Sequence, residues 1–323
     1  MSLKFILGNS GSGKSRVLYE TIIRSSMEAP GETFLVIVPE QFTLQTQKDL
    51  VSLHPRKGIL NIDVLSFQRL AIRALNDAGV DRRKVLEETG KNLVIRRAAM
   101  EHEEELTLLK GSFKKTGYVK EVKSMLSELS QYRITPEHLE KLSERIQEKP
   151  KLYFKCRDLK ILYQAFQKRM EEEYVTAEEL LEVLADHAEK IGTFKGCTIA
   201  LDGFTGFTPI QMELLKKLLP LAKRVLVTVT VDTREDFAKP YHMYELFYLS
   251  KKTIQGLERL AAETHTEIEE PLLLGKNGSV RFQNSPSLAH LEQNLFRRRN
   301  AFREEPKEIS LHVLSNPKEE VHF

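Results

Sequence analysis

Eight residues near the amino terminus have the types and the spacing of a phosphate-binding loop. The pattern G-x-x-x-x-G-K-[ST] is met at every fixed position by Gly8, Asn9, Ser10, Gly11, Ser12, Gly13, Lys14 and Ser15. Glycines allow backbone N–H groups and the positive end of a following helix to surround an anion. The lysine would reach the β- and γ-phosphates of ATP, and the Ser15 hydroxyl would ligate Mg²⁺. The alternative is a glycine-rich turn that carries a lysine by chance.

A strand and a helix must hold such a loop, and the sequence supplies both. Residues 3–7 are apolar apart from one lysine, and residues 16–20 continue in a helical pattern. Further runs rich in β-branched and apolar residues occur at 33–38, 59–65, 198–202 and 225–231. Such runs are typical of parallel strands buried on both faces. Because they alternate with helical segments, we expect an α/β fold with a doubly wound parallel sheet.

The middle of the chain differs from both ends. Residues 84–190 are rich in Glu, Lys, Arg and Leu, and their apolar positions recur every three or four residues, as in amphipathic helices. We therefore predict an all-helical domain at 84–190 inserted into a sheet domain made of 1–83 and 191–300. A polar loop is expected at 263–285. Residues 301–323 are expected to open a further, truncated domain, with a strand at 309–314 and the start of a helix at 318.

Asp202 is the second residue with a chemical role. It follows the apolar run 198–201, and an acid at the end of such a strand is placed to hold Mg²⁺ in a phosphate-loop protein. We therefore predict a magnesium site formed by Ser15 and Asp202, while noting that strands often end in aspartate.

Composition limits the remaining possibilities. The formal net charge is +3, so DNA contacts would come from local patches rather than from a global field. The two cysteines, Cys156 and Cys197, have neither disulfide nor metal spacing, which favours a reducing cytoplasm. No apolar run approaches the ~20 residues that cross a bilayer, so no membrane association is expected.

Three stretches carry a resemblance to a known family. They are V-P-E-Q-F-T at 38–43, L-S-F-Q-R-L at 65–70 and L-D-G-F-T-G-F-T-P-I-Q at 201–211. Together with the phosphate loop, they resemble the first, RecA-like motor domain of UvrD-like superfamily 1 helicases. They resemble more closely the AddB (RexB) subunits of the bacterial ATP-dependent helicase/deoxyribonucleases, counterparts of RecBCD. The resemblance covers essentially the whole chain.

The resemblance implies a role in processing DNA double-strand ends for recombinational repair, beside an AddA-type helicase/nuclease subunit. It implies contacts with single-stranded and double-stranded DNA and makes Asp202 the acid of the Walker B motif. The residues that fall where the family touches single-stranded DNA are Gln41, Thr43, Phe67 and Arg69. The alternative places Phe67 in the core and Arg69 on a solvated helix face. The iron–sulfur cluster of the family belongs to a region outside this stretch.

Departures from the family pattern bear on catalysis. Active helicases have glutamate after the Walker B aspartate, whereas this chain has Gly203, which cannot accept a proton from water. Residues 231–235 also lack the coupling glutamine of active motors. Slow or absent ATP hydrolysis is therefore expected, unless Glu40 or Glu213 replaces the missing base. Two other hypotheses remain: a small-molecule kinase or ATPase with a helical lid, and a platform with a vestigial nucleotide site.

Overall fold

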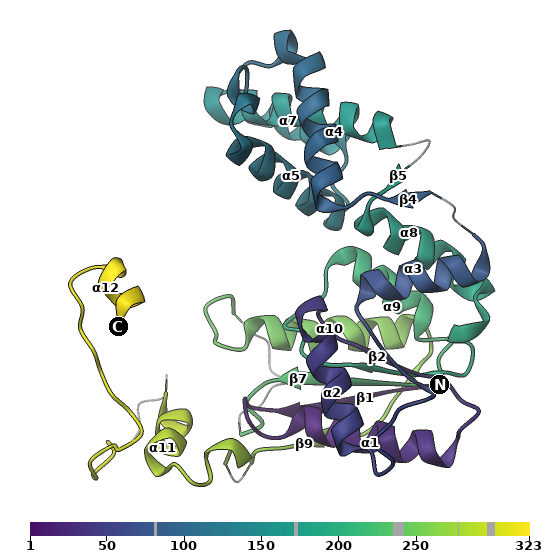
Figure 1. The fold of residues 1–323 in the computed structure, drawn as a ribbon, viewed down its shortest axis with the longest axis vertical. Coiled ribbons are helices and arrows are strands. Elements are labelled where there is room, and N and C mark those ends of the chain that lie inside the picture. Colours follow the sequence, from purple (N-terminus) through teal and green to yellow (C-terminus); the bar gives the residue numbers. More distant parts are fainter. Residues whose placement is uncertain (81–82, 171–173, 235–241, 277, 296–300) are drawn as a thin grey trace.

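The computed structural model describes residues 1–80, 83–170, 174–234, 242–276, 278–295 and 301–323. Within these residues, a parallel sheet of seven strands has the order β3-β2-β6-β7-β1-β8 (Figure 1). The seventh strand, β9, also pairs with β1, further along that strand than β8 does. The strands are β1 (Ser2–Gly8), β2 (Phe34–Ile37), β3 (Ile62–Leu65), β6 (Thr198–Leu201), β7 (Arg224–Thr230), β8 (Glu267–Ile268) and β9 (Leu272–Leu273). The predicted α/β class with a parallel sheet is confirmed.

Both faces of the sheet are buried, which explains the continuous apolar runs. Successive side chains of a strand point to opposite faces. In β2, Leu35 and Ile37 enter one core, whereas Phe34 and Val36 enter the other. The first core is closed by α3 (Phe67–Ala78), α8 (Ala177–His187), α9 (Pro209–Leu218) and α10 (Tyr248–Glu263). The second is closed by α1 (Lys14–Glu28) and α2 (Thr43–Leu53).

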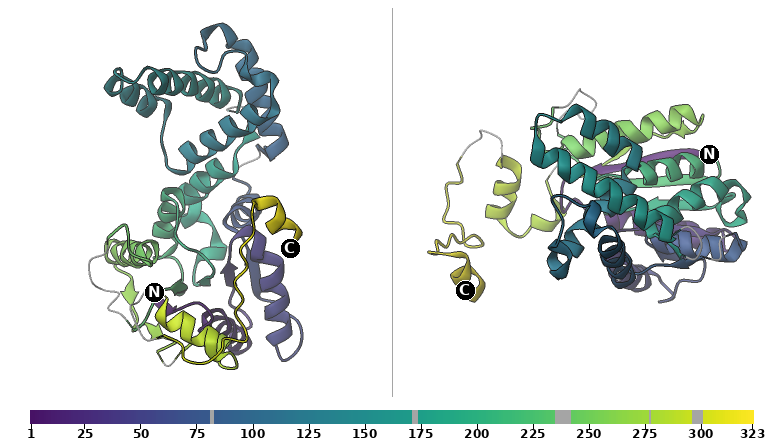
Figure 2. Two further views of the ribbon diagram at one scale, coloured as in Figure 1. Left: turned by 90° about the vertical axis from the view of Figure 1, so that its left-hand side faces the viewer. Right: turned by 90° about the horizontal axis from the view of Figure 1, so that it is seen from above.

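A second group of helices has its own core and stands above the sheet (Figures 1 and 2). It contains α4 (Glu88–Glu101), α5 (Thr116–Gln131), α6 (Pro136–Arg145) and α7 (Pro150–Met170). The short parallel pair β4 (Lys84–Val85) and β5 (Tyr174–Val175) joins it to the rest. Short 3₁₀ turns lie at 40–42, 103–105, 112–114, 188–190, 192–194 and 280–282. The core of this helical group does not include α8, which packs on α3 and α9 in the sheet core. The predicted insertion 84–190 therefore contains one helix that belongs to the sheet core.

A buried carboxylate fixes a loop of the helical group. Asp158 on α7 is fully buried and accepts hydrogen bonds from the backbone N–H groups of Thr107, Leu108 and Leu109, at 2.7 to 3.2 Å. Three donors satisfy the charge and hold this loop against α7.

The last part of the chain corrects two expectations. The predicted strand 309–314 is absent from the described residues, and Leu311 and Val313 are almost fully exposed, because no neighbouring strand supplies hydrogen-bond partners. The predicted loop 263–285 contains β8 and β9, which pair with β1. The remaining helices are α11 (Pro286–Asn294) and α12 (Pro317–His322), and α12 stands away from the sheet (Figures 1 and 2).

Two further features concern the chain as a whole. Cys156 and Cys197 are buried free thiols, and burial raises the pKa of Cys197 to about 11. Across the described ranges, no helix combines the length and the apolar character needed to cross a bilayer.

Candidate functional site

The glycine-rich loop connects β1 to α1 at the carboxyl end of the sheet. β1 ends at Gly8 and α1 begins at Lys14, so the predicted strand, loop and helix follow one another. Gly11 and Gly13 have φ angles of 76° and 90°, a left-handed conformation that strains other residues. These two glycines are therefore required by the shape of the loop.

Ser15 and Asp202 lie far apart in the sequence and meet at this edge. β6 pairs in parallel with β2 and β7, and β7 pairs with β1, so the end of β6 lies beside the loop. The Ser15 hydroxyl donates a hydrogen bond of 3.0 Å to the Asp202 carboxylate, whose residue is 5% exposed. A hydroxyl and a carboxylate side by side are oxygen ligands of the kind that Mg²⁺ takes beside nucleotide phosphates. The donor set therefore fits magnesium.

Two further hydroxyls bind Asp202, and sequence reasoning did not identify them. Tyr19 donates to Oδ2 at 2.7 Å, and Thr228 donates to Oδ1. Burial and the neighbouring Asp202 charge raise the pKa of the Tyr19 phenol, which stays protonated. Tyr19 lies four residues after Ser15, on the same helix face, so helical spacing could have revealed it. Thr228 lies within a continuous apolar strand and gives no such signal.

Lys14 lies under the loop as a partly buried cation. Its ammonium donates a hydrogen bond of 2.8 Å to the Asn9 carbonyl oxygen. Burial lowers its pKa to about 8 against the opposing charge of Asp202, and the Arg281 charge contributes to the lowering. The site thus holds a cation whose charge a phosphate would stabilise.

The loop also contains buried polar atoms without partners in the described residues, namely Asn9 Oδ1 and Ser12 Oγ. The Ser12 hydroxyl is a donor, so an anion's oxygen would satisfy it. The Asn9 side-chain amide donates a hydrogen bond of 2.6 Å to the Glu292 carboxylate on α11. That carboxylate also accepts a hydrogen bond of 2.9 Å from Arg234. Of the predicted loop residues, Ser10 is exposed, whereas Gly8 is buried at the start of the turn.

The residue after Asp202 occupies a special backbone position. Gly203 has a φ angle of 78°, and a Cβ atom added to it would lie 3.6 Å from Pro39 and 3.7 Å from Phe42. Of the alternative bases, Glu40 pairs with Arg69 at 2.8 Å, and the Glu213 charge acts on Arg133 and Lys216. The charges that act on Lys14 are those of Asp202 and Arg281. Neither Glu40 nor Glu213 is among the charges that act on Lys14.

The four predicted DNA contacts separate into two groups. Gln41 is exposed, and Arg69 is largely exposed and paired with Glu40. Thr43 is 8% exposed, and its hydroxyl donates to the Glu40 carbonyl oxygen at 3.0 Å, so it serves the start of α2. Phe67 is 4% exposed, with its ring centroid 5.4 Å from that of Phe204, as the core alternative requires.

A cavity of about 240 Å³ opens beside these residues, at the carboxyl ends of β2, β3 and β6. Phe67 and Phe204 lie in its wall with the amide side chains of Gln68 and Gln211. The edge of a parallel sheet where strands end is where α/β folds bind ligands. Gln41, Thr43 and Arg69 do not line this cavity.

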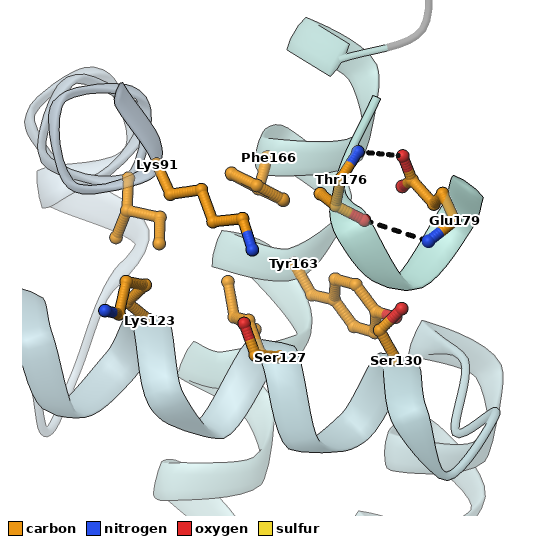
Figure 3. A pocket seen from close by; sticks show the side chains of 10 residues that line it. Lys91, Lys123, Ser127, Ser130, Tyr163, Phe166, Thr176 and Glu179 are labelled. Atoms are coloured by element: carbon orange, nitrogen blue, oxygen red, sulfur yellow. Dashed lines mark hydrogen bonds between the residues drawn. The ribbon is translucent and has the colours of Figure 1, made fainter. Parts of the chain in front are cut away.

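The helical group contains a much smaller cavity (Figure 3). Its volume is about 20 Å³, space for about one water molecule. Lys91 points into it toward Ser127 and Tyr163, while Thr176 and Glu179 cap the start of α8 beside it (Figure 3). This cavity is too small for a nucleotide or a base.

Comparisons with known proteins agree with these observations. Residues 5–292 match the family described as "ADDB, N-terminal". The chain is 44% identical to the B subunit of the ATP-dependent helicase/deoxyribonuclease of Lachnoclostridium phytofermentans, over 98% of this chain and 28% of that protein. It is 35% identical to the corresponding B subunit from Caldanaerobacter subterraneus, over 99% and 27% of the two chains. The chain therefore spans little more than a quarter of these relatives, and it belongs to the AddB N-terminal family.

Proposed function

We propose that this chain is the helicase-like region of an AddB-type subunit that binds ATP with Mg²⁺, is a poor or inactive motor, and guides a DNA single strand. The whole protein would act in the cytoplasm as a heterodimer with an AddA-type subunit, processing DNA double-strand ends for recombinational repair. Family membership and the names of the relatives support this assignment. A small-molecule kinase is less favoured, because the cavity found in the described part of the helical group holds only about one water molecule.

One observation carries the nucleotide part of the proposal. Ser15 and Asp202 are joined by a hydrogen bond, whereas the next residue, Gly203, has neither a side chain nor a conformation that suits a glutamate. Ser15 and Asp202 would hold Mg²⁺, whereas Gly203 offers no acceptor for the proton of an attacking water. ATP would therefore bind and remain largely intact.

The DNA part depends on the surface between the start of α2 and the start of α3. Arg69 has a side chain that is 58% exposed, and Phe42, two residues after the Arg69 partner Glu40, is 48% exposed. A phosphate would replace Glu40 as the partner of Arg69, and an unstacked base would enter the cavity beside Phe204 and meet the amides of Gln68 and Gln211. An exposed cation and an exposed aromatic ring near a cavity lined by both apolar and amide side chains suit a single strand.

Nucleotide binding is tested by titrating the chain with fluorescent ATP in Mg²⁺ and by measuring phosphate release with and without single-stranded DNA. We expect the native chain to bind and Lys14→Ala to lose binding, with negligible phosphate release from both. Arg16→Ala is the control, because Arg16 is an exposed neighbour paired with Glu20. Brisk DNA-stimulated phosphate release, abolished by Lys14→Ala, would refute the inactive motor.

DNA binding is tested by fluorescence anisotropy with a labelled single strand at several salt concentrations. We expect Arg69→Ala to weaken binding and to reduce the salt dependence by about one phosphate contact. Arg73→Ala is the matched control, because Arg73 lies one turn further along α3 and pairs with Asp63 at 2.7 Å. Equal effects of the two substitutions would contradict a defined path at Arg69.

A further inference from the structure

A segment that follows β9 in the sequence lies against the phosphate loop. After β9, residues 278–285 turn back over it. The Ser279 hydroxyl donates to the Ser10 carbonyl oxygen at 3.1 Å, and the Arg281 backbone N–H donates to the Gly11 carbonyl oxygen at 3.1 Å. These bonds fix the segment without using the Arg281 side chain.

The approach is close enough to require a glycine in the loop. A Cβ atom added to Gly11 would lie 2.5 Å from Ser279 Oγ and 2.7 Å from Arg281 Cβ. Because those distances are shorter than any ordinary contact, Arg281 is held directly against the turn that would surround the phosphates.

The Arg281 guanidinium has no ion pair or hydrogen bond with any part of the chain that the structure describes. It is near enough to Lys14 for its charge to depress the pKa of the ammonium. The two cations therefore repel each other, while the Asp202 carboxylate, which accepts hydrogen bonds from three hydroxyls, acts on Lys14 in the opposite sense. A multiply charged anion between the cations would remove that repulsion.

We propose that Arg281 is a phosphate-binding residue of the nucleotide site, supplied in cis by the segment that closes over the loop. This proposal rests on the proposed function, since it concerns the same site. A guanidinium binds phosphate oxygens in a bidentate manner. Lysine in this loop reaches the β- and γ-phosphates, so Arg281 shares those phosphates and distinguishes ATP and ADP from AMP.

The test is a titration of the chain with Mg-ATP, Mg-ADP and AMP, using the native sequence, Arg281→Ala, Arg281→Lys and Lys14→Ala. We expect Arg281→Ala to weaken Mg-ATP and Mg-ADP binding ~10- to 100-fold, with AMP unchanged and partial recovery in Arg281→Lys. Lys276→Ala is the matched control, because Lys276 is an exposed cation on the same return path whose charge does not act on Lys14.

A second readout separates binding from folding. The melting temperature of Arg281→Ala without nucleotide should match that of the native chain, because the bonds from Ser279 and from the residue 281 backbone to the loop remain. Arg281→Gln, with a long polar stem, serves as a second variant if alanine loosens the segment. Native binding that is lost in Lys14→Ala but unchanged in both Arg281→Ala and Arg281→Gln would overturn the role of Arg281 alone. Absence of Lys14-dependent binding in the native chain would overturn the nucleotide site together with it.

Discussion

Nucleotide affinity should depend on pH through Lys14. Its pKa in the nucleotide-free chain is about 8, because burial and Arg281 oppose the charge. Phosphates favour the charged ammonium, so Lys14 takes up a proton on nucleotide binding whenever it is neutral in the free chain. For a free pKa of about 8, affinity falls ~10-fold between pH 7 and pH 9.

Calorimetry in buffers of different ionisation enthalpy measures this coupling directly. Binding of Mg-ADP should take up about 0.1 proton at pH 7, about 0.5 at pH 8 and about 0.9 at pH 9. The Tyr19 phenol remains protonated across this range, because its pKa is raised by burial and by Asp202. Proton uptake therefore reports on the lysine.

Lys14→Arg is the control, because arginine stays charged up to pH 12 and every other titrating group remains. Whatever affinity this variant keeps should not change between pH 7 and pH 9. A native chain whose affinity and proton uptake are equally flat would refute the reasoning, since it would mean that Lys14 is charged throughout or does not meet the nucleotide.

Three other predictions concern catalysis and stability. Gly203→Glu should leave phosphate release at the native level, because a glutamate at a φ of 78° is strained by ~1–2 kcal/mol and need not face the site; a clear rise would contradict this. Asp158→Ala should lower the free energy of unfolding in urea by ~3 kcal/mol, because three backbone N–H groups lose their acceptor; a loss below ~1 kcal/mol would argue against the anchor. Although burial opposes its charge, hydrogen bonds from Arg224 and Ser2 lower the pKa of Glu269 to about 2. That lowered pKa contributes ~2 kcal/mol above pH 4.5, after allowance for solvent screening, which is lost as the pH falls from 4.5 to 2. Glu269→Gln should therefore melt lower at pH 7 and converge with the native chain near pH 2, and equal melting temperatures at pH 7 would exclude the contribution.

The parts of the candidate site that could be predicted are those that a pattern of neighbouring residues defines. The glycine-rich loop would bind a phosphate through its own backbone, so its pattern is visible without knowledge of the fold. Asp202 could be predicted because parallel strands bring their carboxyl ends to one edge, which holds for any doubly wound sheet. The same rule accounts for a cavity lined by Ser66, Phe67 and Gln68, although no cavity was predicted there.

The remaining parts depend on where the chain returns after long excursions. Arg281 and Glu292 meet the loop because two strands of two residues each attach to β1, and such short strands leave no periodic signal. Phe67 begins a helix after a strand, where a base-stacking ring and a core ring have the same pattern. Its burial against Phe204 and Phe207 is decided by residues more than a hundred positions away.

The attachment of β8 and β9 has a consequence for the solubility of shorter versions of the chain. β1 bonds to β7 on one side, and on its other side these two short strands pair with Ser2, Leu3, Ile6 and Leu7. A chain cut before residue 266 would leave the backbone N–H and C=O groups on that side of β1 without partners. An unpaired edge on an apolar strand promotes edge-to-edge aggregation. The return segment thus shields the strand that carries the phosphate loop from pairing with foreign chains.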